Sequence, residues 1–307
     1  MGLLNLRSMN DCIFSVVVPC YNRAHFLPRA IQSILDQTIQ SWELIIVDDG
    51  STDDTSSLVT NFKDSRIQYV RLHSNNGAAH CRNLGIRNAK GRYVAFLDSD
   101  DAFEPEFMQQ HYDLLEAGQY DATVAECRRL LSVSGRTVNI AAIEPKSNLL
   151  TEFVTKKIVW KMYPVWRRTF LLKTLICFDE RLRNCQDYQF NCFAILNKPK
   201  MGYLHRCLGT KYEADIGLDP VKIQHIGSVK SLRSHLLSRI LVLKYARITG
   251  VDDQILSILR RYVLRHRISC YRAAFGISIT SLIKLVKSYR ALKHSEISVD
   301  CVNRVRV

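Results

Sequence analysis

Short apolar runs alternate with helical patterns through the first hundred residues, and this alternation limits the fold more than any other feature. The apolar runs cover residues 13–18, 43–47, 67–72 and 93–97. The helical patterns cover residues 27–35, 53–62 and 78–89. Strands that alternate with helices in this way form a mostly parallel sheet with helices on both faces. The sequence therefore predicts an α/β fold, whose ligands bind at the carboxyl ends of the strands.

Three polar clusters come directly after three of these apolar runs. They are Tyr21-Asn22, Asp48-Asp49 and Asp98 to Asp101. Because the carboxyl ends of parallel strands lie at one edge of a sheet, we expect the three clusters to converge on one crevice. Three independent solvated turns would have no reason to share that edge. The sequence therefore predicts a binding site there.

The third cluster holds three carboxylates within four residues, directly after the buried run 93–97. Hard cations such as Mg²⁺ and Mn²⁺ take oxygen ligands, and Mg²⁺ is usually held by one or two carboxylates together with substrate phosphates. A metal nucleotide is therefore the first candidate ligand. The alternative is a solvated turn whose Asp residues cap a helix that begins near Pro105, and the spacing alone does not separate the two.

The basic character of the chain belongs to its C-terminal third. The formal net charge is +14, and residues 221–307 hold 17 Lys and Arg against 4 Asp and Glu, a net of +13. The same segment shows helical patterns over 228–248, 252–270 and 277–292. We therefore divide the chain into an α/β domain over 1–220 and a basic helical region over 221–307. This region is expected to bind an anionic membrane surface, to form a lid or to form a homodimer contact.

The cysteine content and the hydropathy of the sequence indicate where in the cell the protein is expected. The 10 cysteines include no Cys-x-x-Cys pair and no Cys/His grouping with zinc spacing, which argues against a structural zinc site. No run approaches the roughly 20 apolar residues of a membrane span, and residues 1–7 lack the apolar core of a signal peptide. We expect a cytoplasmic protein without disulfides, either soluble or peripheral at the inner face of the cell membrane.

The assembled motifs resemble the family 2 glycosyltransferases, which are inverting enzymes with the GT-A fold. The matching stretches are residues 16–23, 37–38, 42–55, 75–85 and 91–101. The resemblance implies a mixed, mostly parallel GT-A sheet flanked by helices. It also implies metal-dependent transfer of a hexosyl or N-acetylhexosaminyl group from a nucleotide sugar, with a UDP-sugar as the first candidate. The implied acceptor is a glycan or a lipid-linked molecule in cell-surface polysaccharide synthesis.

The resemblance also implies roles for single residues. Tyr21 would stack on the nucleobase, Asp49 would accept an N–H of the base, and Arg82 would lie near the base and the phosphates. Asp98 would hold the ribose region, and Asp100 would bind the Mn²⁺ or Mg²⁺ that bridges the diphosphate. The expected nucleotide-sugar-binding residues are Pro19, Tyr21, Asn22, Asp49, Arg82, Asp98 and Ser99.

An inverting transfer also needs a base that removes a proton from the acceptor hydroxyl as this group attacks the anomeric carbon. The family places the base in an acidic pair downstream of the metal motif, which falls here on Gln186-Asp187, with Gln in place of the common Glu. Asp187 is therefore the expected catalytic base, although the helix dipole favours a carboxylate in the first turn of any helix. Many relatives carry a Tyr-Arg and a His further on, and here Lys211 or His225 is the candidate for that phosphate contact.

Two other functions remain open from the residues alone. Nucleotidyl transfer also uses α/β sheets with metal-binding carboxylates, but it usually shows a Gly-rich basic loop after the first strand, where this chain has residues 19–22. A basic nucleic-acid-binding protein is supported only by the net charge, which is segregated from the sheet. We therefore expect no nucleic-acid partner. The donor sugar, the acceptor and the linkage depend on residues 120–220, whose pattern is weak.

Overall fold

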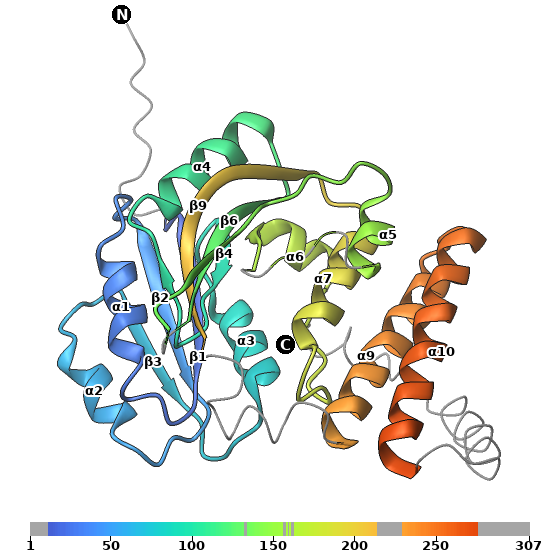
Figure 1. Ribbon diagram of the computed structural model, residues 1–307. Coiled ribbons are helices and arrows are strands. Elements are labelled where there is room, and N and C mark those ends of the chain that lie inside the picture. Colours follow the sequence, from blue (N-terminus) through green and yellow to red (C-terminus); the bar gives the residue numbers. More distant parts are fainter. Residues whose placement is uncertain are drawn as a thin grey trace, which may run out of the picture.

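The computed structural model describes residues 12–131, 134–155, 158, 160, 163–213 and 229–275. Within them the chain forms one mixed sheet with helices packed against both of its faces (Figure 1). The strands are β1 (Phe14–Cys20), β2 (Trp42–Asp48), β3 (Ile67–Arg71), β4 (Tyr93–Phe96), β5 (Ala102–Phe103), β6 (Ala122–Leu131), β7 (Thr137–Ile140), β8 (Val165–Arg167) and β9 (Met201–Glu213). The helices are α1 (Leu27–Leu35), α2 (Thr55–Asn61), α3 (Ala78–Asn88), α4 (Phe107–Gly118), α5 (Leu149–Val154), α6 (Arg168–Thr174), α7 (Gln186–Leu196), α9 (Val229–Ile248) and α10 (Asp253–Phe275).

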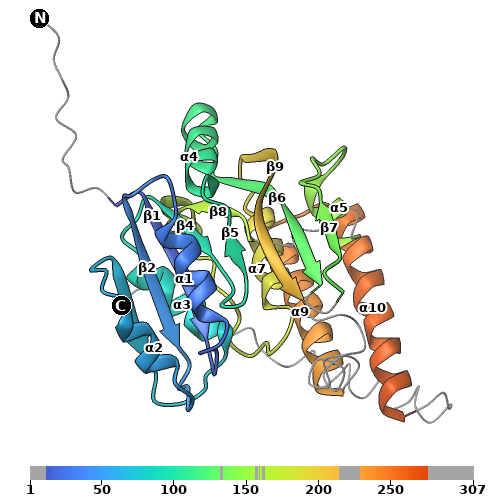
Figure 2. The ribbon, with the colours of Figure 1, turned by 60° about the vertical axis from the view of Figure 1, so that its left-hand side comes forward.

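The order of strands along the sheet is β3-β2-β1-β4-β8-β6-β9-β5, and β7 pairs with β6 at the side (Figure 2). The strands β3, β2, β1 and β4 pair only in parallel with one another. Beyond β4 the pairs are antiparallel, except that β6 and β9 run in parallel. This arrangement confirms the predicted mixed sheet flanked by helices.

Alternate residues of β1 belong to opposite hydrophobic clusters. Val16 and Val18 pack with the apolar face of α1, whereas Val17 packs with α3 on the other side of the sheet. Because both faces are covered, β1 and β2 read as continuous apolar runs and not as alternating ones. The helix α3 lies so close that a Cβ on Gly85 would come within 2.2 Å of Val17 Cγ1. Glycine at this position lets α3 rest directly on the strand.

Several element boundaries differ from the sequence-based expectations, and two of these differences have a clear local cause. The first strand does not end before Pro19 but continues to Cys20. Pairing between β1 and β4 stops at Val17, so the N–H that Pro19 lacks breaks no ladder bond on that side. The helix expected over 53–62 begins at Thr55, because the carboxylate of Asp53 accepts hydrogen bonds from Thr55 N (3.1 Å) and Oγ1 (2.5 Å) and holds the preceding residues in a turn.

The helices α9 and α10 confirm the predicted helical character of residues 228–270. Both share a hydrophobic cluster with α5, α7 and β6, and in Figure 1 α9 lies beside α7 and α10 lies beside α9. The pattern at 277–292 and the proposed boundary at residue 220 fall outside the described residues, so the division into two domains stays a prediction. None of the helices in the described part of the chain is long and apolar enough to cross a bilayer.

Candidate active site at the strand ends

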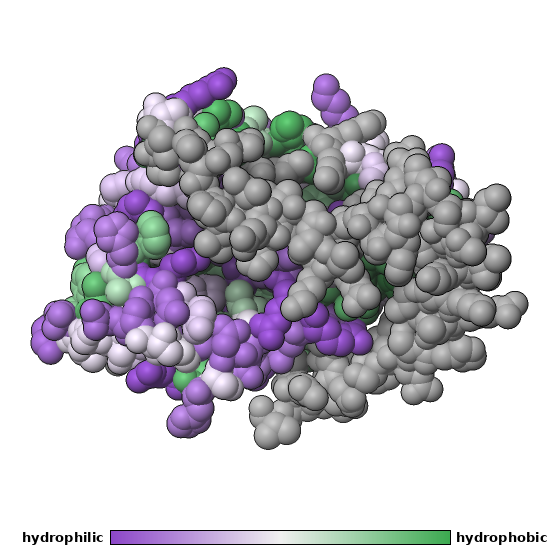
Figure 3. All heavy atoms as spheres, turned by 60° about the horizontal axis from the view of Figure 1, so that its bottom comes forward, coloured by the Kyte–Doolittle hydropathy of each residue, from purple (hydrophilic) through white to green (hydrophobic). Residues whose placement is uncertain are grey.

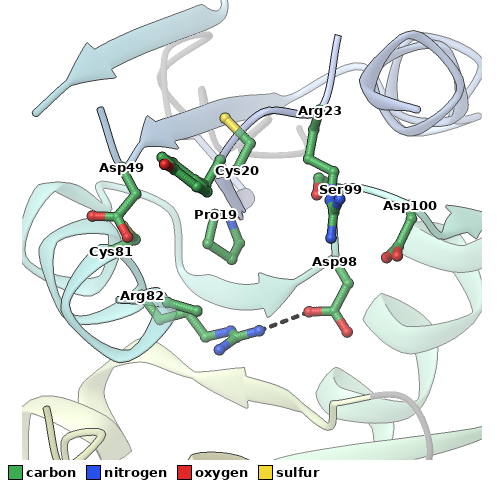
Figure 4. A pocket seen from close by; sticks show the side chains of 11 residues that line it. Pro19, Cys20, Arg23, Asp49, Cys81, Arg82, Asp98, Ser99 and Asp100 are labelled. Atoms are coloured by element: carbon green, nitrogen blue, oxygen red, sulfur yellow. Dashed lines mark hydrogen bonds and ion pairs between the residues drawn. The ribbon is translucent and has the colours of Figure 1, made fainter. Parts of the chain in front are cut away.

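A cavity of about 300 Å³ opens where β1, β2 and β4 end. Its lining comes from these strand ends and from the start of α3, and consists of Pro19, Cys20, Tyr21, Arg23, Asp49, Ala78, Cys81, Arg82, Asp98, Ser99 and Asp100 (Figure 4). The strands point toward the face that Figure 3 brings forward, where hydrophilic residues dominate the coloured surface. The three polar clusters of the sequence thus meet in one crevice, as the alternation of strands and helices predicts.

Seven of the expected site residues line this cavity: Pro19, Tyr21, Asp49, Arg82, Asp98, Ser99 and Asp100. Sequence reasoning missed the other four lining residues, which are Cys20, Arg23, Ala78 and Cys81. The signal for Arg23 was its place next to Tyr21-Asn22 at the end of the first strand. In Figure 4 the Arg23 side chain extends toward Asp98 and Ser99, so it adds a cation to a wall that otherwise carries carboxylates.

Asn22 is an expected site residue that does not line the cavity and instead connects two loops. Its backbone is left-handed, with φ of 51°, a conformation that Asn tolerates better than most residues. Its N–H donates to Ser51 Oγ (2.8 Å), and its side-chain oxygen accepts the N–H of Thr52 (2.8 Å). Asn22 therefore ties the loop after β1 to the loop after β2, and it lies outside the cavity lining.

Asp49 is held by two backbone N–H groups. Its Oδ1 accepts the N–H of Asn76 and its Oδ2 accepts the N–H of Gly77, each at 2.7 Å. Gly77 has φ of 98°, which a residue with a side chain rarely adopts, so glycine here allows the close turn. Each carboxylate oxygen can accept a second hydrogen bond. Asp49 is therefore fixed in place and still able to receive an N–H of a ligand.

Two cations bind the carboxylate of Asp98. Arg82 Nη2 donates to Oδ1 at 2.7 Å, and Lys211 Nζ donates to Oδ2 at 3.2 Å. Lys211 also forms an ion pair with Asp101, which is 2% exposed. Burial raises the pKa of Asp98, but Lys211 and Arg82 outweigh it and hold that pKa well below its usual range. Asp98 is thus ionised and compensated before any ligand arrives.

The pKa values of Lys211 and Asp101 are shifted as well. Burial lowers the pKa of Lys211, but Asp98 and Asp101 outweigh it, so that the pKa of the ammonium lies well above its ordinary value. Burial raises the pKa of Asp101 to about 7, with Asp98 adding to the rise and Lys211 opposing it. Lys211, a candidate for the phosphate contact, is therefore already bound to the carboxylates of Asp98 and Asp101. The other candidate, His225, lies outside the described residues.

Arg82 is 5% exposed and lies against two aromatic rings, with Cζ 4.9 Å from the ring centre of Tyr163 and 5.5 Å from that of Phe178. Its Nε and Nη1 are buried and have no hydrogen-bond partner among the described residues. Buried donors without partners are costly, so they favour a ligand that brings acceptor oxygens. Arg82 can therefore bind Asp98 and a ligand at the same time.

Asp187 lies in the first turn of α7 and is exposed to solvent. It is outside the cavity lining, but its charge is among the influences that raise the pKa of Arg82 and of the buried Tyr163 hydroxyl. Burial is the largest influence on both pKa values, since it lowers that of Arg82 and raises that of Tyr163. Asp187 is therefore within electrostatic reach of Arg82, which lines the cavity.

The residues present fit a divalent ion that is held mainly by its ligand. The described residues contain no group of three or more His, Cys, Asp or Glu side chains that could hold a metal by themselves. Asp98 and Asp101 are already paired with cations, which leaves Asp100 as the carboxylate of this turn that faces the cavity without such a partner in the described structure. One carboxylate together with diphosphate oxygens is a usual environment for Mg²⁺.

The chain is similar to known glycosyltransferases in sequence and in structure. A family model described as "Glycosyl transferase family 2" matches residues 15–170. An uncharacterized glycosyltransferase of Rickettsia conorii is 45% identical over 113 residues, covering 36% of this chain and 18% of the relative. This chain spans less than a fifth of the length of that relative and of two others from Rickettsia.

The names of two further relatives state a biosynthetic process or a reaction. The succinoglycan biosynthesis protein ExoO of Rhizobium meliloti is 29% identical over 238 residues, covering 72% of this chain and 68% of the relative. WfgD of Escherichia coli, named as a UDP-Glc:α-D-GlcNAc-diphosphoundecaprenol β-1,3-glucosyltransferase, is 44% identical over 93 residues, covering 30% of this chain and 37% of the relative.

Solved structures match almost the whole chain. S. aureus TarS superposes with a TM-score of 0.65 at 19% identity, covering 92% of this chain and 93% of the other, and has also been solved with UDP and with UDP-GlcNAc. The mannosyltransferase PcManGT of Pyrobaculum calidifontis, in complex with GDP-Man and Mn²⁺, gives 0.58 at 16% identity, covering 94% and 82%. These matches confirm the expected GT-A fold.

Replacing Lys211 by Met tests the ion pairs of the Asp-rich turn. Removing one partner of a buried pair leaves uncompensated charge and costs about 3–5 kcal/mol of unfolding free energy. The loss should be largest above pH 7, where Asp98 and Asp101 are ionised, and should shrink toward pH 5 as the uncompensated carboxylates take up protons. Urea denaturation at both pH values measures it.

Lys200→Met is the matched control, since Lys200 is an exposed lysine whose Nζ donates to Gly118 O. It should change the unfolding free energy little at either pH. An equally small and pH-independent effect of Lys211→Met would contradict the ion-pair assignment.

Proposed function

The chain belongs to glycosyltransferase family 2, and on this premise we propose that it transfers one sugar from a UDP-sugar to a glycan or lipid-linked acceptor in cell-surface polysaccharide synthesis. The observation that carries the proposal is the cavity at the ends of β1, β2 and β4, which combines Tyr21, two carboxylate clusters and Arg82. UDP and UDP-GlcNAc in the TarS structures and the lipid-linked acceptor in the name of WfgD support the donor and acceptor classes. A hexosyl or N-acetylhexosaminyl group fits these relatives.

In the proposed complex the nucleoside lies between the ends of β1 and β2. Tyr21, 43% exposed, presents its ring for stacking on the base, and Asp49 accepts an N–H from it. Pro19 and Ser99 complete the walls of the cavity. Asp98, held by Arg82 and Lys211, accepts a hydroxyl of the ribose. The buried N–H groups of Arg82 then meet oxygens of the ligand, which removes the cost of leaving them without partners.

Asp100 is the residue that would hold Mn²⁺ or Mg²⁺ together with the diphosphate. When bound, such an ion offsets the negative charge that develops on the leaving nucleoside diphosphate. Arg23 faces the same wall and can add positive charge beside the phosphates (Figure 4). The protein thus supplies a mostly fixed electrostatic environment for the leaving group.

Asp187 is the proposed catalytic base. As the acceptor hydroxyl attacks the anomeric carbon, its proton passes to the Asp187 carboxylate, the new carbon–oxygen bond forms, and the bond to the phosphate oxygen breaks. The nucleoside diphosphate leaves with the electron pair of that bond. A single displacement inverts the anomeric centre and needs no enzyme nucleophile, unlike the two-step retaining route of glycosidases.

The proposed acceptor class favours a cytoplasmic protein that works at the inner face of the membrane. The net charge of +13 over residues 221–307 is consistent with attraction to anionic lipid. The lid and homodimer alternatives for this region stay predictions. Family membership ranks both earlier alternatives, nucleotidyl transfer and nucleic-acid binding, below sugar transfer.

Calorimetry with UDP and Mn²⁺ tests the donor site. Asp100→Asn should weaken UDP binding in the presence of Mn²⁺ by about 10- to 100-fold, because it removes the charged protein ligand of the ion. Binding without metal should change little. Asp113→Asn, an exposed Asp on α4, is the control and should behave as wild type. Equal Mn²⁺ enhancement in Asp100→Asn and wild type would remove Asp100 from the metal site.

Turnover of a panel of nucleotide sugars, followed as UDP release with water as the acceptor that Asp187 would deprotonate, tests the base. Asp187→Asn should lower kcat by about 10²- to 10⁴-fold, since a positioned base contributes this factor. UDP affinity should stay at the wild-type value because Asp187 lies outside the cavity lining. Unchanged kcat in Asp187→Asn would assign the base to another residue.

A further inference from the structure

The segment before α7 leads directly into the helical turn that carries Asp187. This segment, residues 175–185, is called the α6–α7 loop here. It ends at Cys185, which caps α7 with a left-handed backbone (φ of 60°) and makes no side-chain capping hydrogen bond. A residue with a Cβ adopts this conformation only at an energetic cost, so surrounding contacts must hold it.

Two consecutive residues of α9 bind the last two residues of this loop. Ser234, 7% exposed, accepts the N–H of Asn184 at 3.0 Å and donates its hydroxyl to Asn184 O at 2.8 Å. The Nδ1 atom of His235 lies 3.0 Å from Cys185 Sγ. Both polar groups of the Asn184 backbone are thus satisfied by one side chain that is 50 residues away in sequence.

The body of α7 rests on the same helix. The guanidinium of Arg239 lies 4.5 Å from the ring centre of Tyr188, and the rings of Phe193 and Tyr245 stack at 4.2 Å. Asn197, at the end of α7, donates its side-chain N–H to Tyr245 OH at 3.0 Å. These contacts follow α7 from its first turn to its last, which agrees with the side-by-side course of α7 and α9 in Figure 1.

The other side of the loop is fixed to α3, the helix that carries Arg82. The Asn83 side chain donates to Phe178 O and accepts Phe178 N–H, both at 2.9 Å. Glu180 accepts a hydrogen bond from Asn83 at 3.0 Å and lies 3.0 Å from His80 Nδ1. The α6–α7 loop is therefore held between the helix of the nucleotide cavity and a helix of the C-terminal region.

We propose that Ser234 is a positioning residue for the catalytic base: by binding both polar groups of the Asn184 backbone, it fixes the start of α7 so that Asp187 faces the donor. The inference rests on the role proposed for Asp187. It makes α9 part of the catalytic unit, whatever the rest of residues 221–307 contacts.

Ser234→Ala tests this role, with Ser238→Ala as the matched control. Ser238 is fully buried on the same helix, but its hydroxyl donates to His235 O and accepts a hydrogen bond from Arg239 Nη1, so both of these bonds lie within α9 and neither reaches the loop. The first readout is hydrogen exchange of α7, above all the Gln189 amide, which donates to Cys185 O at 3.1 Å and reports closure of the first turn. The second is kcat for UDP-sugar turnover, and the third is UDP–Mn²⁺ affinity.

In Ser234→Ala we expect exchange at Gln189 to accelerate about five- to tenfold, the factor for loss of one or two hydrogen bonds. We expect kcat to fall by a similar or larger factor while UDP affinity and the KM for the donor stay at wild-type values. Ser238→Ala should leave the exchange of this turn and kcat near wild type.

Unchanged exchange and kcat in Ser234→Ala would overturn the proposal, as would equal losses in both variants or faster exchange with unchanged kcat. A wild-type protein that binds UDP but turns over no nucleotide sugar would refute the proposed function instead. In that case the exchange measurement still decides whether Ser234 holds the start of α7.

Discussion

The carboxylate of Asp98, bound by Arg82 on one side and Lys211 on the other, is the interaction on which the rest of the site depends. It joins three separate elements, because Asp98 follows β4, Arg82 belongs to α3 and Lys211 belongs to β9. The pair also sets the charge of the cavity, since the cations compensate Asp98 and Asp101 before a ligand binds. Of the three carboxylates in the turn, Asp100 is then the one without a cation partner in the described structure, and it is the one proposed to bind a metal nucleotide. A site preorganised in this way needs little rearrangement when charge develops on a leaving group.

The described structure links the two halves of the proposed reaction through one loop. The donor side is built from β1, β2, β4 and α3, and the acceptor side begins with Asp187 on α7. The α6–α7 loop contacts α3 through Asn83 and α9 through Ser234. A shift of either helix would therefore move the start of α7, and Asp187 with it. The basic C-terminal region therefore contributes to the interior of the protein through α9.

Much of the donor half is predictable from sequence, because local patterns specify it. The apolar runs of β1, β2 and β4 and the polar residues that follow them predict both the sheet and the convergence of Tyr21, Asp49 and Asp98. The partners of these residues are not predictable in the same way. Lys211 reaches Asp98 only because β9 pairs with β6 and β5, a register that no local periodicity reports. The strand β8 has three residues, too few for a pattern, and Asn22 fits a binding motif although its side chain bridges two loops. The contacts of Ser234 join segments 50 residues apart and are equally invisible in sequence.

The most direct test of the central claim is a crystal structure of this chain with UDP and Mn²⁺. We expect the uracil to lie between Tyr21 and Asp49, and the ion to be bound by Asp100 together with oxygens of the diphosphate. We also expect Asp98 to stay bonded to Arg82 and Lys211. A nucleotide outside the cavity, or a metal bound by Asp98 after displacement of Lys211, would contradict the central claim.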